Sequence, residues 1–301
     1  MEVGFIGIGR MGMPMASNVA NAGFALTVFD KVTERAEALT KKGAYIASNP
    51  AEVAERSEVV VTMLNDAKAV SEVIFGERGV LYGSAPDGVV VDMSTTSPSS
   101  AREFASAAEE RGVAFLDAPV SGSVSLAETA ELTTMVGGPR AAFDRVEPVL
   151  ASMTQEQVYL GPSGTGAAMK LAVNSLLAVV NQGIAEALIM AERAGVDRAQ
   201  AYDVIASSAG GPPYAQYKRQ HFLDPDAPVT FTTTQMQKDL GLALDLAREL
   251  NLPAVLTATT NEMLAAACGL GYAEEDFVAV TDVLRVLSGT EALSDRARAR
   301  Q

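Results

Sequence analysis

The sequence has very few of the residues that build disulfides, metal centres or hydrolytic triads. It contains one cysteine, Cys268, and one histidine, His221. A lone cysteine cannot form an internal disulfide, and in its apolar helical run we expect it to act as a small buried hydrophobe. A lone histidine excludes a metal site built on several histidines and disfavours a Ser-His-Asp mechanism. We therefore expect no metal, and we expect His221 at the surface.

Positive charge and long uncharged runs are also scarce. The formal net charge of −14 disfavours a nucleic-acid partner, because such binding depends on clustered lysine and arginine. The longest weakly charged run, residues 171–185, is too short to cross a bilayer. Met1-Glu2 leads directly into the first predicted strand and leaves no pattern of a signal or transit peptide. We expect a cytoplasmic protein without a membrane span.

The order of apolar segments predicts two domains. Up to about residue 160, β-branched strands alternate with helical stretches, which predicts a doubly wound, mostly parallel α/β sheet. A breaker cluster follows at residues 161–166, and every later segment has helical length. We predict a Rossmann domain over residues 1–162 and an all-helical substrate and dimerisation domain over residues 163–301.

The expected elements can be placed from periodicity and breakers. The strands are expected at residues 3–6, 26–30, 58–62, 88–92, 113–116, 132–136 and 157–160, and the later helices at 166–194, 198–207, 232–250, 254–268 and 275–287. The first of these helices is apolar on most of its circumference, so it is expected to lie between helices or between subunits. Residues 296–301 form a basic tail that we expect to be frayed.

A glycine-rich turn follows the first strand and predicts a dinucleotide site. The turn reads Gly7-Ile8-Gly9-Arg10-Met11-Gly12. The three glycines serve a tight turn, close approach of the backbone to a pyrophosphate, and close packing of helix on strand. The N–H groups at the start of the helix would meet the negative charge.

Asp30, at the end of the second strand, predicts which dinucleotide binds. A carboxylate accepts hydrogen bonds from a ribose 2′-hydroxyl and repels a 2′-phosphate, so NAD is favoured over NADP. Lys31 and Arg35 lie close by and would partly compensate, so NADP stays open. Two later strand ends carry Leu64-Asn65 and Thr95, which either face the cofactor crevice or are plain strand termini.

Two segments predict a substrate site. Ser121-Gly122-Ser123 follows a strand and offers N–H groups and hydroxyls to an anion such as a carboxylate, although a polar turn would look the same. Lys170 and Asn174 share one face of a helix, where both side chains would bind the same small polar molecule. Lys170 is either catalytic or paired with a carboxylate across the domain boundary, and Asn174 belongs to the same network.

Two further segments are open to more than one interpretation. Lys238 and Asp239 are adjacent on a helix and need not pair with each other, so they fit an ordinary charged face. Residues 214–219 carry aromatic and cationic side chains, which fits either a specificity segment or a solvated loop.

Four motifs in this order resemble those of the β-hydroxyacid dehydrogenase family, which includes 3-hydroxyisobutyrate dehydrogenases and tartronate, glyoxylate and succinic semialdehyde reductases. The motifs are residues 4–16, 117–122, 161–174 and 238–243. The resemblance implies a Rossmann domain followed by a helical domain, a homodimer or homotetramer, and a small carboxylate substrate. It also implies that Lys170 is catalytic and that Asn174 orients the substrate beside it.

The remaining roles follow from the same resemblance. Ser121, Gly122 and Ser123 would bind the substrate carboxylate, and Lys238 would reach both cofactor and substrate. Leu64, Asn65 and Thr95 match cofactor-contacting positions. The family's imine-reducing relatives replace the lysine that is retained here, so alcohol and aldehyde chemistry is favoured.

Two departures leave the substrate open. Ser123 and Ala130 stand where the family more often has glycine, and serine at the first position is frequent in a glyoxylate-reducing branch that prefers NADP. The alternatives are an imine reductase, a non-catalytic NAD(P)-binding regulatory protein of the same fold, and phosphogluconate dehydrogenase chemistry, which would want a basic phosphate pocket.

Overall fold

The computed structural model describes residues 1–290 and 292, so the predicted basic tail lies outside the described residues. The chain divides into two compact units, Met1–Leu171 and the residues from Ala172 onward. The division falls inside the long helix α9 (Thr165–Arg193), whereas the sequence-based boundary at residues 162 and 163 precedes that helix.

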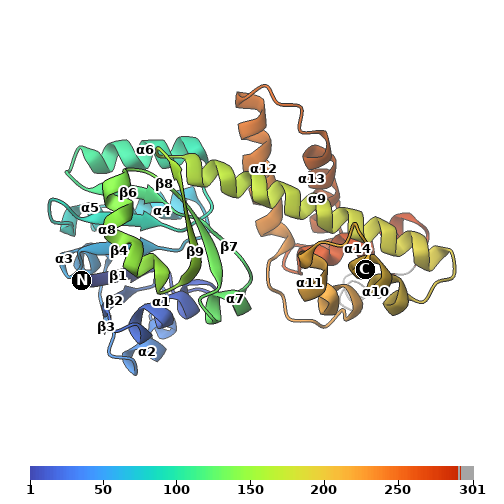
Figure 1. The fold of residues 1–301 in the computed structure, drawn as a ribbon, viewed down its shortest axis with the longest axis horizontal. Helices are drawn as coiled ribbons and strands as arrows, with labels where there is room; N and C mark the ends of the chain where they lie inside the picture. Colours follow the sequence, from blue (N-terminus) through green and yellow to red (C-terminus); the bar gives the residue numbers. More distant parts are fainter. Residues whose placement is uncertain (291, 293–301) are drawn as a thin grey trace. The chain divides into compact units, whose positions relative to one another are not determined.

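The first unit is built on one nine-stranded sheet (Figure 1). Its strands are β1 (Glu2–Ile6), β2 (Ala25–Phe29), β3 (Tyr45–Ile46), β4 (Val59–Thr62), β5 (Val89–Asp92), β6 (Ala114–Asp117), β7 (Val120–Ser121), β8 (Leu132–Gly137) and β9 (Thr154–Gly161). The order β3-β2-β1-β4-β5-β6 is parallel throughout, which is the dinucleotide-binding order. The doubly wound sheet predicted from the sequence is confirmed.

The strands bury both faces by simple alternation. Val59 and Val61 of β4 enter one core and Val60 enters the other, because successive side chains of a strand point to opposite faces. Helices α1 (Gly12–Asn21), α2 (Glu34–Thr40), α7 (Val124–Glu128) and α8 (Arg140–Ala151) cover the first face. Helices α3 (Pro50–Glu55), α4 (Ala67–Phe75), α5 (Val80–Gly83) and α6 (Pro98–Glu109) cover the second.

Two features of the sheet were not predicted. The short strands β3 and β7 have two residues each, too few to show a period. Strand β8 runs antiparallel to β6 and β7 and parallel to β9, so the sheet is mixed at this end.

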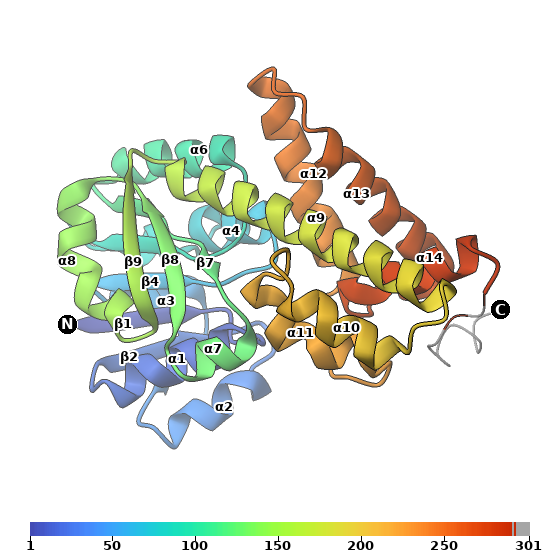
Figure 2. The ribbon, with the colours of Figure 1, turned by 45° about the vertical axis from the view of Figure 1, so that its right-hand side comes forward.

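The second unit is helical, as predicted (Figure 2). Beyond α9 it contains α10 (Arg198–Ser207), α11 (Pro213–Leu223), α12 (Thr233–Glu249), α13 (Val255–Ala267), a π-helical turn (Cys268–Tyr272), a 3₁₀ turn (Phe277–Ala279) and α14 (Val280–Leu287). Residues 214–219 therefore belong to helix α11 and not to a loop. Pro213 occupies the first turn of α11, where a missing N–H does no harm.

Helix α9 is long and apolar enough to cross a membrane by length and composition alone. The prediction that length excludes a span was therefore wrong, because the whole helix extends beyond the uncharged run. Ala185 and Leu188 are completely buried, however, and belong with Ala178 to the hydrophobic core of the helical unit. The helix therefore contributes to the core of the helical unit.

Candidate functional site

The glycine-rich turn lies at the carboxyl end of β1, where it leads into α1. Gly7 has φ of +97°, and a Cβ there would come within 2.3 Å of the Met63 carbonyl oxygen. A Cβ on Gly12 would come within 1.8 Å of the Gly7 carbonyl oxygen. A Cβ on Gly9 would meet no atom within 4 Å. Packing of the chain thus requires Gly7 and Gly12, whereas Gly9 faces open space of the kind a closely approaching ligand needs.

Asp30 joins the second strand to this turn. Its two carboxylate oxygens accept hydrogen bonds from the backbone N–H of Ile8 at 2.7 Å and of Val32 at 2.8 Å. The Arg35 guanidinium lies 3.8 Å away and is half exposed. Asp30 therefore fixes the turn, and its remaining lone pairs are suited to sugar hydroxyls.

The first turn of α1 suits a negative ligand. No side chain caps the N-terminus of α1, so its N–H groups and the helix dipole favour an anion there. Arg10 is exposed and Met11 is half-buried at the same end. These residues fit a dinucleotide with its pyrophosphate over the turn.

The ends of β4 and β5 lie beside the turn, because β4 pairs directly with β1. Leu64 is half-buried and its N–H donates to the Ser94 hydroxyl at 2.9 Å. Asn65 is exposed and Thr95 is half-buried. All three predicted cofactor positions therefore lie at the same edge of the sheet as Gly7.

A buried aspartate that the sequence analysis did not select organises these strand ends. One oxygen of Asp92 accepts from the Thr62 hydroxyl at 2.8 Å and from the Ser94 N–H at 3.1 Å. Burial raises the pKa of Asp92 to about 6, although the hydrogen bonds from Ser94 and Thr62 oppose the rise.

The predicted carboxylate-binding turn is held by β7. Ser121 is half-buried and pairs with Thr133 across the antiparallel β7–β8 contact. Gly122 has φ of +140°, and a Cβ there would lie 2.5 Å from Leu132 Cδ2. The Ser123 hydroxyl caps α7 by accepting from the Leu126 N–H at 3.4 Å. The serine that departs from the family pattern thus has a local structural role.

Lys170 and Asn174 occupy the same helix, α9, one turn apart. Lys170 is half-buried. Asn174 is buried, and its Nδ2 donates to Asp239 Oδ2 at 2.6 Å.

Asp239 and Lys238 form an ion pair, contrary to the interpretation as an ordinary charged face. Asp239 is only 2% exposed, and Lys238 Nζ lies 3.0 Å from its second oxygen. The lysine stem is long enough to return to its neighbour's carboxylate. The burial of Asp239 was not predicted from the sequence. The available signal was its place on the buried stripe of α12, three residues after Met236 and four before Ala243.

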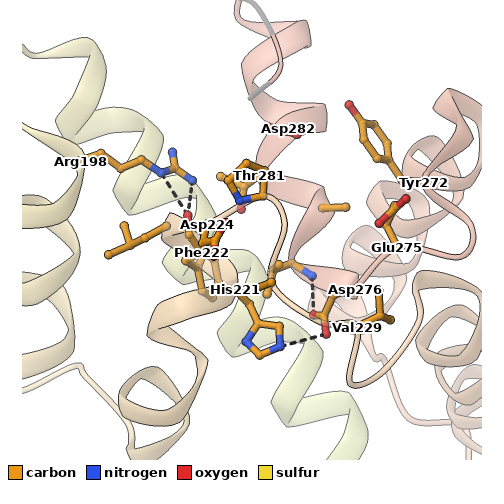
Figure 3. A pocket seen from close by; sticks show the side chains of 15 residues that line it. Arg198, His221, Phe222, Asp224, Val229, Tyr272, Glu275, Asp276, Thr281 and Asp282 are labelled. Carbon is orange, nitrogen blue, oxygen red and sulfur yellow. Dashed lines mark hydrogen bonds and ion pairs between the residues drawn. The ribbon is translucent and has the colours of Figure 1, made fainter. Parts of the chain in front are cut away.

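The helical unit contains a partly open hollow whose lining includes none of the predicted site residues (Figure 3). His221 borders it with a side chain only 10% exposed, 3.8 Å from Asp276. The prediction of a surface histidine was wrong, because the His221 ring lies next to Asp276 and its Nε2 is 3.0 Å from the Pro228 carbonyl oxygen. Burial and the nearby Lys218 ammonium lower the pKa of His221.

Lys218, which was assigned to a solvated or specificity segment, is also buried. Its ammonium lies 2.7 Å from both oxygens of Asp276. Cys268 is partly exposed, not buried as expected, and its thiol donates to Gln237 Oε1 at 3.4 Å. Among residues 1–290 and 292, no group of three or more His, Cys, Asp or Glu side chains is placed to bind a metal.

Two family models together match nearly the whole chain. The NAD-binding domain of 6-phosphogluconate dehydrogenase matches residues 2–161. The NAD-binding model of NADP-dependent 3-hydroxyisobutyrate dehydrogenase matches residues 164–284.

Curated relatives match at similar identity over similar lengths. The 2-(hydroxymethyl)glutarate dehydrogenase of Eubacterium barkeri is 34% identical, covering 96% of each chain. The mitochondrial 3-hydroxyisobutyrate dehydrogenase of Mus musculus is 35% identical, covering 94% of this chain and 87% of the relative. The 3-sulfolactaldehyde reductase of Escherichia coli is 34% identical, covering 96% of this chain and 98% of the relative.

Solved structures agree with the sequence matches. The 3-hydroxyisobutyrate dehydrogenase of Salmonella typhimurium superposes with a TM-score of 0.88 at 32% identity, covering 94% of this chain and 99% of that chain. An imine reductase of Myxococcus stipitatus, at 21% identity and a TM-score of 0.64 over 94% and 99% of the two chains, shares the fold alone. The chain therefore belongs to the β-hydroxyacid dehydrogenase family of NAD(P)-dependent oxidoreductases, as its motifs indicated.

Proposed function

We propose that the chain transfers a hydride reversibly between NAD and the alcohol carbon of a small β-hydroxy acid of the 3-hydroxyisobutyrate type, or its semialdehyde. The observation that carries the proposal is the pair of polar groups on α9, a half-buried lysine and a buried asparagine one turn apart. Two curated relatives are named for substrates that carry a hydroxymethyl group next to the carbon bearing the carboxylate. The substrates proposed here have the same arrangement of hydroxymethyl group and carboxylate.

Bound NAD(P) would supply the hydride chemistry at nicotinamide C4, and the protein would supply geometry and proton transfer. In the oxidising direction the neutral amine of Lys170 takes the proton of the substrate hydroxyl. In the reducing direction the ammonium of Lys170 returns it. Asn174 orients the hydroxyl, and Lys238 contacts cofactor and substrate.

The carboxylate of the substrate is assigned to the turn formed by Ser121, Gly122 and Ser123. The N–H groups and hydroxyls of such a turn suit an anion. The Ser123 hydroxyl accepts from the Leu126 N–H and shares a 2.7 Å hydrogen bond with the Ser125 hydroxyl, so it would donate to the substrate when Ser125 is the donor of that pair.

We favour NAD over NADP because of Asp30. A 2′-phosphate next to this carboxylate would be repelled, whereas a 2′-hydroxyl would donate to it. Arg35 is half exposed and 3.8 Å from Asp30, so its charge is already partly neutralised. We expect kcat/KM to be higher with NAD than with NADP.

The test is a substrate panel with both cofactors, followed by the absorbance of reduced nicotinamide. It contains 3-hydroxyisobutyrate, glycerate, 3-hydroxypropionate, 4-hydroxybutyrate, serine, the corresponding aldehydes and a cyclic imine. Lys170→Ala should lower kcat by about two to four powers of ten while NAD still binds. Lys68→Ala, at an 86% exposed position, is the matched control and should leave kcat unchanged. Near wild-type turnover in Lys170→Ala would remove that residue from the chemistry.

Two alternatives give different results in the same panel. An imine reductase would reduce the cyclic imine and leave the hydroxy acids untouched. A non-catalytic NAD(P)-binding regulatory protein would bind cofactor and turn over nothing.

We further propose a cytoplasmic homodimer or homotetramer that binds a small carboxylate and no nucleic acid. Leu176 and Met190 on α9 are 66% and 73% exposed, and such apolar side chains on a core helix suit a contact with a second copy. Light scattering should give about two or four times the chain mass of 31.4 kDa. A monomer at micromolar concentration would contradict this proposal.

A further inference from the structure

The carboxylate of Asp117 joins the end of β6 to the start of α9. Its Oδ1 accepts from the Gly164 N–H at 2.8 Å, and its Oδ2 accepts from the Ala167 N–H at 2.9 Å. The side chain is 2% exposed. A single buried carboxylate therefore caps α9 from 50 residues away in the sequence, at the helix end where a negative charge is favoured.

The backbone segments around Asp117 pack closely against one another. A Cβ on Gly166 would lie 2.3 Å from the Met135 carbonyl oxygen and 2.4 Å from the Asp117 carbonyl oxygen. A Cβ on Gly137 would lie 2.8 Å from Asp117 Oδ1. The ends of β6 and β8 and the first turn of α9 thus approach each other as closely as backbones can.

Asp117 also begins the segment that carries the predicted carboxylate-binding turn. The next residues are held to the sheet, because the Thr134 hydroxyl donates to the Ala118 carbonyl at 2.8 Å and the Met135 N–H donates to the Pro119 carbonyl at 3.0 Å. Ser121 follows in β7. One residue is therefore attached through its backbone to the turn and through its side chain to α9.

Lys170 lies three residues after Ala167 on the same helix. A helix keeps that spacing fixed, so the hydrogen bonds of Asp117 also fix the position of the Lys170 backbone relative to β6. We propose that Asp117 is a positioning residue that sets the separation between the turn at Ser121–Ser123 and Lys170. The proposal rests on the proposed function of Lys170 as the proton-transfer group.

The reaction depends strongly on that separation. A displacement of about 1 Å between a substrate held at one point and the group that acts on it can cost about 100-fold in rate. The Asp117 carboxyl group is buried, and burial raises its pKa. Hydrogen bonds from the N–H groups of Gly164 and Ala167 oppose this rise. Removing one acceptor would let the helix start move without removing the helix.

Asp117→Asn is the main test, because the amide keeps the shape and can accept from only one of the two N–H groups. We expect kcat to fall 10- to 100-fold, the Kd for NADH to stay within twofold, and the primary deuterium isotope effect on kcat to increase. Asp117→Glu keeps the charge but lengthens the side chain, and we expect the same pattern. It also serves as the second variant if Asp117→Asn does not fold.

A matched control separates positioning from stability. Asn49 caps α3 by accepting from the Glu52 N–H at 3.0 Å, in the same unit, and is not one of the predicted site residues. Asn49→Ala should lower the melting temperature without changing kcat or the isotope effect. Asp117 variants that are less stable but keep wild-type kcat and isotope effect would overturn the positioning role. Retained turnover in Lys170→Ala would instead overturn the proposed function, so the two failures are distinguishable.

Discussion

Ala130 is held in a backbone conformation that favours glycine, and the family pattern has glycine at this position. Its φ is +58°. It follows α7, whose end is closed by a hydrogen bond from the Glu131 N–H to the Leu126 carbonyl at 2.8 Å and a longer one from the Ala130 N–H to the Ala127 carbonyl at 3.4 Å. This is a Schellman motif with alanine at the left-handed position.

Ala130→Gly should therefore stabilise the protein. The left-handed conformation costs an alanine about 1–2 kcal/mol, and the added freedom of glycine in the unfolded chain costs about 0.4–1 kcal/mol. The difference is a gain of about 0.8 kcal/mol, which corresponds to roughly 2 °C in melting temperature for a unit of this size. Differential scanning calorimetry would measure it, and kcat/KM should not change because the backbone conformation is kept.

The reverse substitution at a matched position is the control. Gly23 follows α1 with φ of +88°, and a Cβ there would meet no atom within 4 Å. Gly23→Ala should lower the melting temperature by at least as much as Ala130→Gly raises it. If Gly23→Ala destabilises as expected and Ala130→Gly has no effect or lowers the melting temperature, the strain assigned to Ala130 is refuted.

Three more predictions concern buried charge and the glycine turn. Because the pKa of Asp92 is about 6 when folded and near 3.8 when unfolded, the ionised group costs up to about 3 kcal/mol above pH 6, and this cost disappears as the pH falls toward 4. Asp92→Asn, which keeps an acceptor oxygen, should therefore be more stable than wild type at pH 7 but not at pH 4 in urea unfolding, and equal stabilities at pH 7 would contradict the raised pKa. Gly9→Ala should weaken NADH binding about tenfold or more, measured by fluorescence titration, and should not change the melting temperature of the free protein. Gly12→Ala should lower that melting temperature. Equal NADH affinity of Gly9→Ala and wild type would show that no ligand approaches Gly9. Lys218→Met should destabilise the helical unit by about 3 kcal/mol, because it leaves Asp276 charged and buried, and adding Asp276→Asn should recover part of the loss.

The alternation of strands and helices made most of the first unit predictable. Runs such as Val59–Thr62 and Val89–Asp92 have no other reasonable interpretation than buried parallel strands. The antiparallel direction of β8 was not predictable, because a strand's direction depends on its neighbours and not on its own residues. Helix α11 was missed because its face is only weakly amphipathic, although Pro213 marked its start.

The candidate site was predictable where chemistry and spacing coincide. The glycine turn and the Lys170–Asn174 pair could be selected from the sequence alone. The buried carboxylates of Asp92 and Asp117 could not, because their partners lie up to 50 residues away in the sequence. The one available signal was an aspartate ending each of two apolar strands that turn out to be neighbours.

The uninterrupted course of α9 has a consequence for redesign. Lys170 and Asn174 lie on one continuous rod of helix, about 6 Å apart along its axis. A library intended to accept bulkier acids should therefore leave this rod untouched and vary the residues that bound the substrate's far end.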